Sequence, residues 1–287
     1  MPFGALQSRG APDRFVVQDY DVAVAPAART LLQRAPEESM SARRMLLVAD
    51  PVYGKGDSRL VAREGGAQAP RANGSSRQFR GESDADTLER LPGTAAEAAM
   101  IRSLFKKNEI DALEGIAATR DRFLATDFRD YRFIHIASHA VADSEIPQLS
   151  ALIFSTVDTN GTSINGRVLG ADLLNIRLNA QLLVLSGCET ALGKSVRGEG
   201  LIGLQYIMLA RGAQSVVSSL WAVPDRETAE LMSQFYAATL QAGASPRSAL
   251  SGAMRSLISR QSDPGIWSAF TLTTSALRDR PSSTAAH

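Results

Sequence analysis

Apolar runs alternate with amphipathic stretches along most of this chain. Runs closed by turn-forming or polar residues predict core strands at 45–49, 131–137, 152–155, 182–185 and 215–221, with shorter strands at 110–113 and 267–272. Helical periodicity predicts helices near 94–105, 119–124, 170–174, 201–210, 227–240 and 246–258. Because strands and helices alternate, we expect an α/β fold: a mostly parallel sheet with helices on both faces.

Some boundaries have a specific signal. Thr94 with Glu97 three residues on predicts a capping box, and Thr119 predicts the start of the next helix. The helix at 201–210 is nearly all apolar and should be buried. Near the start of the chain, residues 14–24 favour one or two short strands and residues 27–33 a short helix.

Two stretches lack this periodicity. Residues 54–87 are rich in Gly, Ser and charged residues, which predicts a long flexible loop. Residues 279–287 read as a disordered tail. We therefore expect one domain over 1–278. The 44% hydrophobic content of the 287 residues is enough for a sizeable core.

The charge balance argues against two classes of partner. Lys and Arg number 31 against 30 Asp and Glu, so nothing favours nucleic acid or an anionic membrane. One cysteine excludes an internal disulfide and any multi-Cys zinc site. Neither a signal-peptide core nor a membrane-length apolar run is seen, so a bacterial-type cytoplasmic protein without metal or cofactor is expected.

The single cysteine, Cys188, follows the apolar strand at 182–185. Ligands of open α/β sheets bind beyond the carboxyl ends of strands, so this thiol is a candidate nucleophile. His139 follows the strand at 131–137 in the same way, 49 residues earlier. An imidazole there could take the thiol proton and later protonate a leaving amine. The alternative for Cys188 is a buried small hydrophobe.

The other two histidines are less suited to catalysis. His135 lies inside the strand, where a packed or hydrogen-bonded core histidine is expected, and His287 lies in the polar tail. Backbone N–H groups of Cys188 and of a residue near His139 could bind the developing oxyanion, and Gly187 allows close backbone approach.

Several motifs in order resemble one family. The segments 135–139 (HIASH), 185–193 (LSGCETALG), 197–200 (RGEG) and 219–225 (SLWAVPD) resemble the CHAT domain, a caspase-like cysteine peptidase family. It is related to separase, caspases and gingipains and is often attached to tetratricopeptide repeats. The resemblance implies a caspase–hemoglobinase-like fold with His139 and Cys188 as the dyad. The family usually has Gly after this histidine; Ala140 here keeps the N–H as an oxyanion donor. The segment 2–6 resembles a point inside the family's domain, which leaves open whether its first strand is present.

The same fold places further residues near a substrate. Trp221 would form an apolar wall, and Asp225 or Glu189 would favour a basic residue before the cut. The alternatives are that Trp221 belongs to the core, Asp225 caps the next helix and Glu189 receives hydrogen bonds from the next turn. Glu199 is expected to brace the loop after Cys188.

Two functions therefore remain. The first is a cysteine endopeptidase acting on a protein or peptide through a Cys188 thioacyl-enzyme, with His139 as general base and acid. The second is a catalytically silent CHAT scaffold that binds a regulatory partner or repeat domain. A third, weaker option is another acyl-transfer enzyme with a cysteine nucleophile. The natural substrate, the trigger and the oligomeric state are not encoded in any motif.

Overall fold

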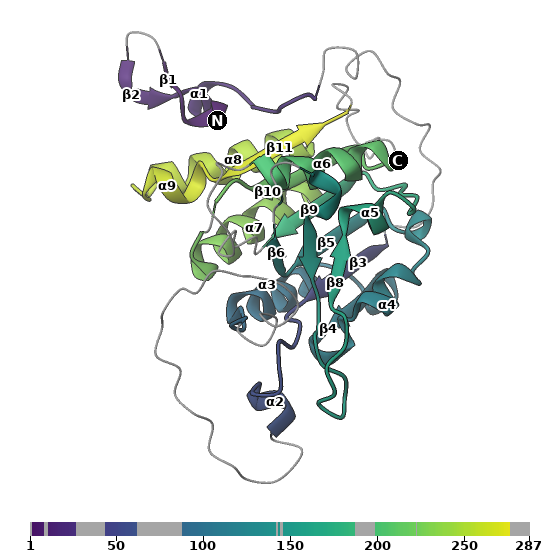
Figure 1. Cartoon of the computed structure of the whole chain (residues 1–287). Coiled ribbons are helices and arrows are strands. Elements are labelled where there is room, and N and C mark those ends of the chain that lie inside the picture. Colours follow the sequence, from purple (N-terminus) through teal and green to yellow (C-terminus); the bar gives the residue numbers. More distant parts are fainter. Residues whose placement is uncertain are drawn as a thin grey trace.

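A six-stranded sheet forms the centre of the molecule (Figure 1). The computed structural model describes residues 2–8, 11–26, 44–61, 88–141, 143, 146–186, 199–221 and 223–275. The sheet has the order β11-β10-β9-β5-β3-β4. Its strands are β3 (Met45–Ala49), β4 (Ile110–Glu114), β5 (Phe133–Ala137), β9 (Leu182–Ser186), β10 (Ser215–Ser219) and β11 (Phe270–Thr274). All neighbours are parallel except β10 and β11, which confirms the predicted mostly parallel sheet.

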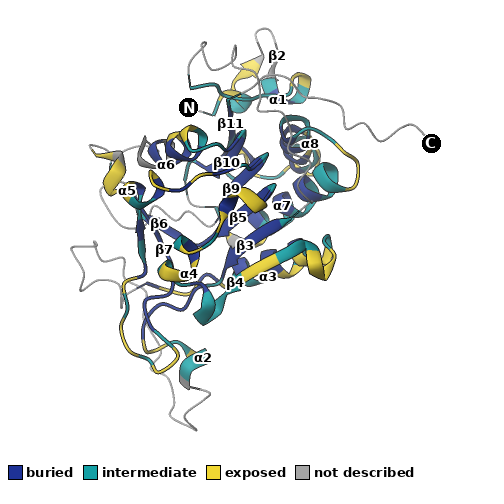
Figure 2. Ribbon diagram, turned by 90° about the vertical axis from the view of Figure 1, so that its right-hand side faces the viewer, coloured by how far each residue is buried: buried dark blue, intermediate teal, exposed yellow. Residues whose placement is uncertain are grey.

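Helices cover both faces of this sheet, as predicted (Figure 2). On one face lie α3 (Pro92–Ser103), α7 (Asp225–Leu240) and α8 (Pro246–Ser259). On the other lie α4 (Arg120–Leu124) and α6 (Glu199–Ala210). Alternate residues of β3 enter the two cores: Leu46 packs on the α6 side and Leu47 on the α7 side. Burial on both faces explains why the central strands are continuous apolar runs.

A smaller antiparallel sheet leads away from the end of β5. It consists of β6 (His139–Val141), β7 (Ala151–Ile153) and β8 (Arg167–Leu169), followed by α5 (Gly170–Leu173). Only its middle strand was predicted. The remaining elements are η1 (Phe3–Ala5), β1 (Gln7–Ser8), β2 (Ala11–Phe15), α1 (Val16–Asp19), α2 (Ser58–Val61), η4 (Lys107–Glu109), η5 (Gly115–Ala117), η6 (Phe128–Asp130), η7 (Pro147–Leu149) and α9 (Pro264–Trp267).

Three boundary predictions need correction. The Thr94–Glu97 capping box is wrong, because α3 begins at Pro92 with Leu91 as N-cap. Thr94 lies inside the helix and donates to the Leu91 carbonyl at 2.7 Å. The last strand begins at Phe270, because Trp267 ends the short helix α9. The predicted strand at 14–24 is interrupted by the helix α1.

One predicted helix cap is confirmed, and other predictions fall partly or wholly outside the described residues. Thr119 caps α4 by accepting from the Arg122 N–H, as expected. Part of the predicted loop, residues 54–61, is described and contains α2. Residues 62–87, the helix expected at 27–33 and the tail at 279–287 lie outside the described residues. Within the described part of the chain, no helix has the length and apolar character needed to cross a membrane.

Candidate active site

The two candidate catalytic residues follow neighbouring parallel strands. Ala137, the last residue of β5, pairs with Ser186, the last residue of β9. His139 comes two residues after Ala137, and Cys188 comes two residues after Ser186. Parallel strands end at the same edge of a sheet, where ligands of α/β proteins bind. Cys188, Gly187 and Glu189 themselves lie outside the described residues.

Both the ring and the backbone of His139 contact other segments of the chain. Its ring is buried, with 3% of the residue exposed, and Nε2 lies 2.7 Å from the carbonyl oxygen of Glu89. A carbonyl oxygen only accepts hydrogen bonds, so Nε2 carries a proton. In the neutral ring the basic lone pair is therefore on Nδ1. This is the tautomer that a general base needs if Nδ1 faces the nucleophile.

Tyr53, in the segment after β3, orients the same histidine. The His139 backbone N–H donates to Tyr53 Oη at 3.2 Å, and Tyr53 Oη donates to the Ile153 carbonyl at 3.2 Å. The two rings are tilted by 55° with centroids 4.9 Å apart. Burial raises the pKa of Tyr53 well above its ordinary value. The phenol therefore stays protonated and fixes the start of β6.

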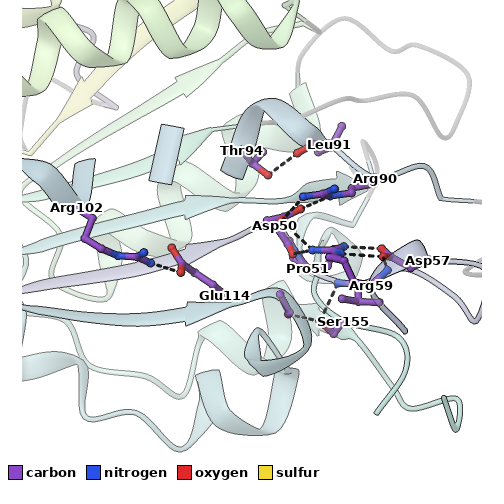
Figure 3. Close-up of polar contacts among 12 residues, drawn as sticks. Asp50, Pro51, Asp57, Arg59, Arg90, Leu91, Thr94, Arg102, Glu114 and Ser155 are labelled. Atoms are coloured by element: carbon purple, nitrogen blue, oxygen red, sulfur yellow. Dashed lines mark hydrogen bonds and ion pairs between the residues drawn. The ribbon is translucent and has the colours of Figure 1, made fainter. Parts of the chain in front are cut away.

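An ion-pair cluster shapes the two segments that touch His139 (Figure 3). Asp50 has φ 50°, and its carboxylate accepts from Arg90 at 2.9 and 2.8 Å and pairs with Arg59 at 2.8 Å. Arg59 also donates to the carbonyls of Asp50 and Pro51. Arg90 follows Glu89 directly, so its pairing with Asp50 ties the Glu89 carbonyl to the end of β3.

The charges of this cluster favour the ionised state of Asp57. Burial raises the pKa of Asp57, but hydrogen bonds from Arg59 outweigh it and hold that pKa below its ordinary value. The hydrogen bond to Asp50 raises the pKa of Arg90. Asp57 and Arg90 are therefore charged at neutral pH, and their ion pairs stabilise the turn after β3.

The remaining predicted site residues are placed as follows. Ala140 is buried in β6 opposite Leu152, and its φ is not positive, because only Asp50 and Gln261 have positive φ among the described non-glycine residues. Glu199 is the first residue of α6, and nothing of its side chain is described.

The candidate pocket residues Trp221 and Asp225 both lie after β10. Trp221 packs partly against the core on the α7 side, and its indole N–H donates to the Gly265 carbonyl at 2.7 Å. Asp225 is the first residue of α7, where Pro224 occupies the N-cap position, so Asp225 is not the cap.

His135 is a core histidine, as its position inside a strand predicted. It is 0% exposed, and its Nδ1 lies 2.9 Å from Tyr236 Oη. No group of three or more His, Cys, Asp or Glu side chains that could hold a metal ion occurs among the residues that the structure describes.

Sequence reasoning missed the groups that orient His139. Glu89 acts through its backbone carbonyl, which leaves no signature in the side-chain pattern. Tyr53 had one usable signal, because it follows closely on the end of the buried strand at 45–49. Neither residue is near His139 in the sequence, and only the folded sheet edge brings them together.

The chain is similar to one family over most of its length. The model of the CHAT domain matches residues 1–275. Tetratricopeptide repeat protein 28 of Mus musculus is 38% identical over 104 residues, and that of Homo sapiens is 36% identical over 104 residues. These matches cover 36% of this chain and 4% of each relative.

Two solved structures of peptidases are similar in fold. The Arg-specific cysteine proteinase gingipain R has a TM-score of 0.45 and 9% identity, covering 86% of this chain and 50% of its own. Separase in the Saccharomyces cerevisiae separase–securin complex has a TM-score of 0.44 and 13% identity, covering 91% and 14%. Both scores are below 0.5, so the family match and the geometry of the sheet edge carry the functional argument.

Proposed function

Because the chain belongs to the CHAT domain family, whose fold is caspase-like, we propose that it is a cysteine endopeptidase. The nucleophile is Cys188, and His139 is its general base and acid. The observation that carries this proposal is the 2.7 Å contact of His139 Nε2 with the Glu89 carbonyl, at the sheet edge where the parallel strand that leads to Cys188 also ends.

The reaction follows from these two groups. Nδ1 of His139 accepts the thiol proton, and the Cys188 sulfur forms a bond to the carbonyl carbon of the scissile peptide. The same nitrogen then gives its proton to the leaving amine as the C–N bond breaks. Water, deprotonated by His139, hydrolyses the thioester and releases the acid. The protonated Nε2 keeps its bond to Glu89 throughout, so the ring does not rotate between steps.

Oxyanion stabilisation is assigned to backbone N–H groups. The N–H of Cys188 and that of Ala140 are the proposed donors, with Gly187 leaving room for the substrate. Ala140 lies next to His139 in β6, and its strand geometry requires no left-handed backbone. The replacement of the family's usual Gly by Ala therefore adds no backbone strain at this position.

Active-site labelling combined with peptide hydrolysis tests the proposal. Purified full-length protein should cleave a member of a fluorogenic peptide library, and a peptidyl electrophile should modify Cys188 in the intact mass. Cys188→Ala should abolish both. His139→Ala should lower kcat by at least about 10³-fold, since one triad member contributes on this order or more. His287→Ala is the matched control and should retain full activity.

Three results would overturn the proposal. Equal labelling of Cys188 in wild-type protein and in His139→Ala would remove the dyad. Cleavage of no peptide, together with intact folding and binding of a partner, would favour the scaffold function instead. Turnover of small esters without peptide cleavage would indicate a different acyl-transfer enzyme.

Substrate preference is the finer part of the proposal. Carboxylates of Glu189 and Asp225 beside the scissile bond would favour Lys or Arg before the cut, with Trp221 as an apolar wall. Asp225→Asn should then lower kcat/KM for basic peptides by at least about 10-fold and leave uncharged peptides unchanged. An unaltered profile would assign Asp225 to the helix alone.

A tetratricopeptide repeat domain is the proposed kind of regulatory partner.

A further inference from the structure

A cluster of polar side chains lies in the core beneath the candidate active site. It joins Glu97 of α3, His135 of β5 and Tyr236 of α7, of which 2%, 0% and 0% are exposed. Glu97 is the one acidic residue among the buried residues that the structure describes. Its surroundings are the apolar side chains of α3, α7 and α8. Isolating a carboxylate there is costly unless hydrogen bonds compensate for lost hydration.

Polar contacts join these three residues to Ser186 of β9. His135 Nε2 lies 3.3 Å from Glu97 Oε1, without the geometry of a hydrogen bond. Burial, followed by the charge of Glu97, raises the pKa of Tyr236 well above its ordinary value. The phenol therefore stays protonated at neutral pH, and its oxygen lies 2.9 Å from His135 Nδ1. Ser186 Oγ lies 2.9 and 2.8 Å from the two Glu97 oxygens and donates from the opposite side.

Ser186 links this cluster to the sheet edge. It is the last residue of β9, two positions before Cys188. Its carbonyl accepts the N–H of Ser138 at 3.2 Å, and the Ser138 hydroxyl donates to the His139 carbonyl at 3.2 Å. Hydrogen bonds thus connect Glu97 of α3, through Ser186, to the residue that precedes His139, and the hydrogen-bonded pair of His135 and Tyr236 lies against Glu97.

Stability alone does not explain such a cluster. Replacing a buried ionic set by well-packed apolar residues is often neutral or stabilising, so its presence is weak evidence for stability. Hydrogen bonds differ from apolar contacts in being directional, and they fix distances between particular atoms. Here they join Ser186 of β9 to α3 and His135 of β5 to α7, and the two pairs meet where His135 Nε2 lies 3.3 Å from Glu97 Oε1.

We propose that Glu97, His135, Tyr236 and Ser186 form a positioning network that sets the relative placement of the ends of β5 and β9. This inference rests on the proposed peptidase function. The network does not touch substrate; it acts through the two strand ends. An error of about 1 Å in the separation of reacting groups can lower a rate about 10²-fold, so small shifts at Ser186 matter.

Conservative variants test this role in the full chain. Tyr236→Phe and Ser186→Ala each remove one hydroxyl and keep the surrounding shape, and Glu97→Gln keeps the shape but removes the charge. Leu257→Ala is the control, because Leu257 is buried in the same core without a polar group in the network. Each variant is measured for Tm, for kcat and KM on the best library peptide, and for the ring ¹⁵N shifts of His139 as pH is varied.

The expected result separates positioning from stability. Tyr236→Phe and Ser186→Ala should lower kcat about 10- to 100-fold with KM within about twofold. Leu257→Ala should lower Tm at least as much while retaining most of kcat. Ser186→Thr, which restores a hydroxyl, should recover more kcat than Ser186→Ala. A loss of kcat that follows Tm in all variants, control included, would overturn the proposal.

The NMR readout distinguishes failure of this proposal from failure of the peptidase function. The chain has three histidines, so the ring signals are assignable by substitution. If the wild-type protein cleaves no peptide, the network variants should still alter the ¹⁵N shifts or the titration midpoint of His139, and Leu257→Ala should not. Unchanged His139 signals in Tyr236→Phe, Ser186→Ala and Glu97→Gln would overturn the positioning role on their own.

Discussion

At the residue scale, the hydroxyl of Tyr53 orients the backbone of His139. It accepts from the His139 N–H and donates to the Ile153 carbonyl, inside the protein. Tyr53→Phe leaves both partners without this hydroxyl and should lower the free energy of unfolding by about 1–3 kcal/mol. Urea unfolding measures the change. Tyr20→Phe, at a residue that is 67% exposed, should change it by less than about 0.5 kcal/mol. Equal effects would contradict the assigned hydrogen bonds.

The sequence predicted where the candidate catalytic residues lie better than it predicted which groups contact them. His139 and Cys188 could be selected because each follows an apolar strand by the same short interval. The bond from His139 Nε2 to Glu89 could not be predicted, since a backbone carbonyl 50 residues away has no side-chain signature. The misplaced role of Glu97 has a similar cause. Its spacing from Thr94 imitates a capping box, whereas in the fold its carboxylate accepts from the buried hydroxyl of Ser186.

Replacing either of two glycines by Ala should change the free energy of unfolding, but in opposite directions. Gly212, after α6, has φ +119°, and a Cβ there would clash with the Leu178 carbonyl oxygen. Gly212→Ala should therefore lower the free energy of unfolding by about 2–4 kcal/mol. Gly252 lies inside α8, and nothing is within 4 Å of a Cβ there. Gly252→Ala should raise the free energy of unfolding by about 0.5–1 kcal/mol through helix propensity. Chemical denaturation compares them; the same sign for both would contradict this assignment.

Element prediction succeeded where burial and periodicity agreed. The inner strands β3, β5, β9 and β10 are covered on both faces, and each appears in the sequence as an apolar run near its observed position. The strands β6 and β8 are three residues each, too short for a periodic signal, and were missed. Trp267 was assigned to a strand because its aromatic ring fits one, but Asp263 caps the short helix that contains it. Tertiary packing decides such short elements.

At the scale of the whole molecule, the start of the chain is held by its last helices and strand. The segment around α1 lies over α8, α9 and β11 (Figure 1). Arg255 donates to the Val17 carbonyl at 2.7 Å and pairs with Asp21 at 2.7 Å. Val24 forms a parallel bridge with Thr273 at the edge of the main sheet. Contacts more than 200 residues apart in sequence therefore close the fold, and no local pattern predicts them.

Acid should loosen this closure at a defined pH. Burial raises the pKa of Asp21, but hydrogen bonds from Ser248 and Arg255 outweigh it, so the folded pKa lies below the ordinary value of 3.8. Because folding lowers its pKa, Asp21 stabilises the folded chain at pH above the ordinary value of 3.8. This contribution to stability is lost as pH falls through the folded pKa. The difference in unfolding free energy between wild type and Asp21→Asn should thus be constant above about pH 5 and shrink below about pH 4. Urea unfolding across pH measures it, with Asp121→Asn, at a side chain that is 92% exposed, as the flat control. A difference independent of pH would mean that Asp21 contributes no charge-dependent stability. Amide hydrogen exchange at residues 16–24 should be faster in Asp21→Asn than in the wild type at neutral pH, because Asp21 helps to attach the segment around α1 to α8.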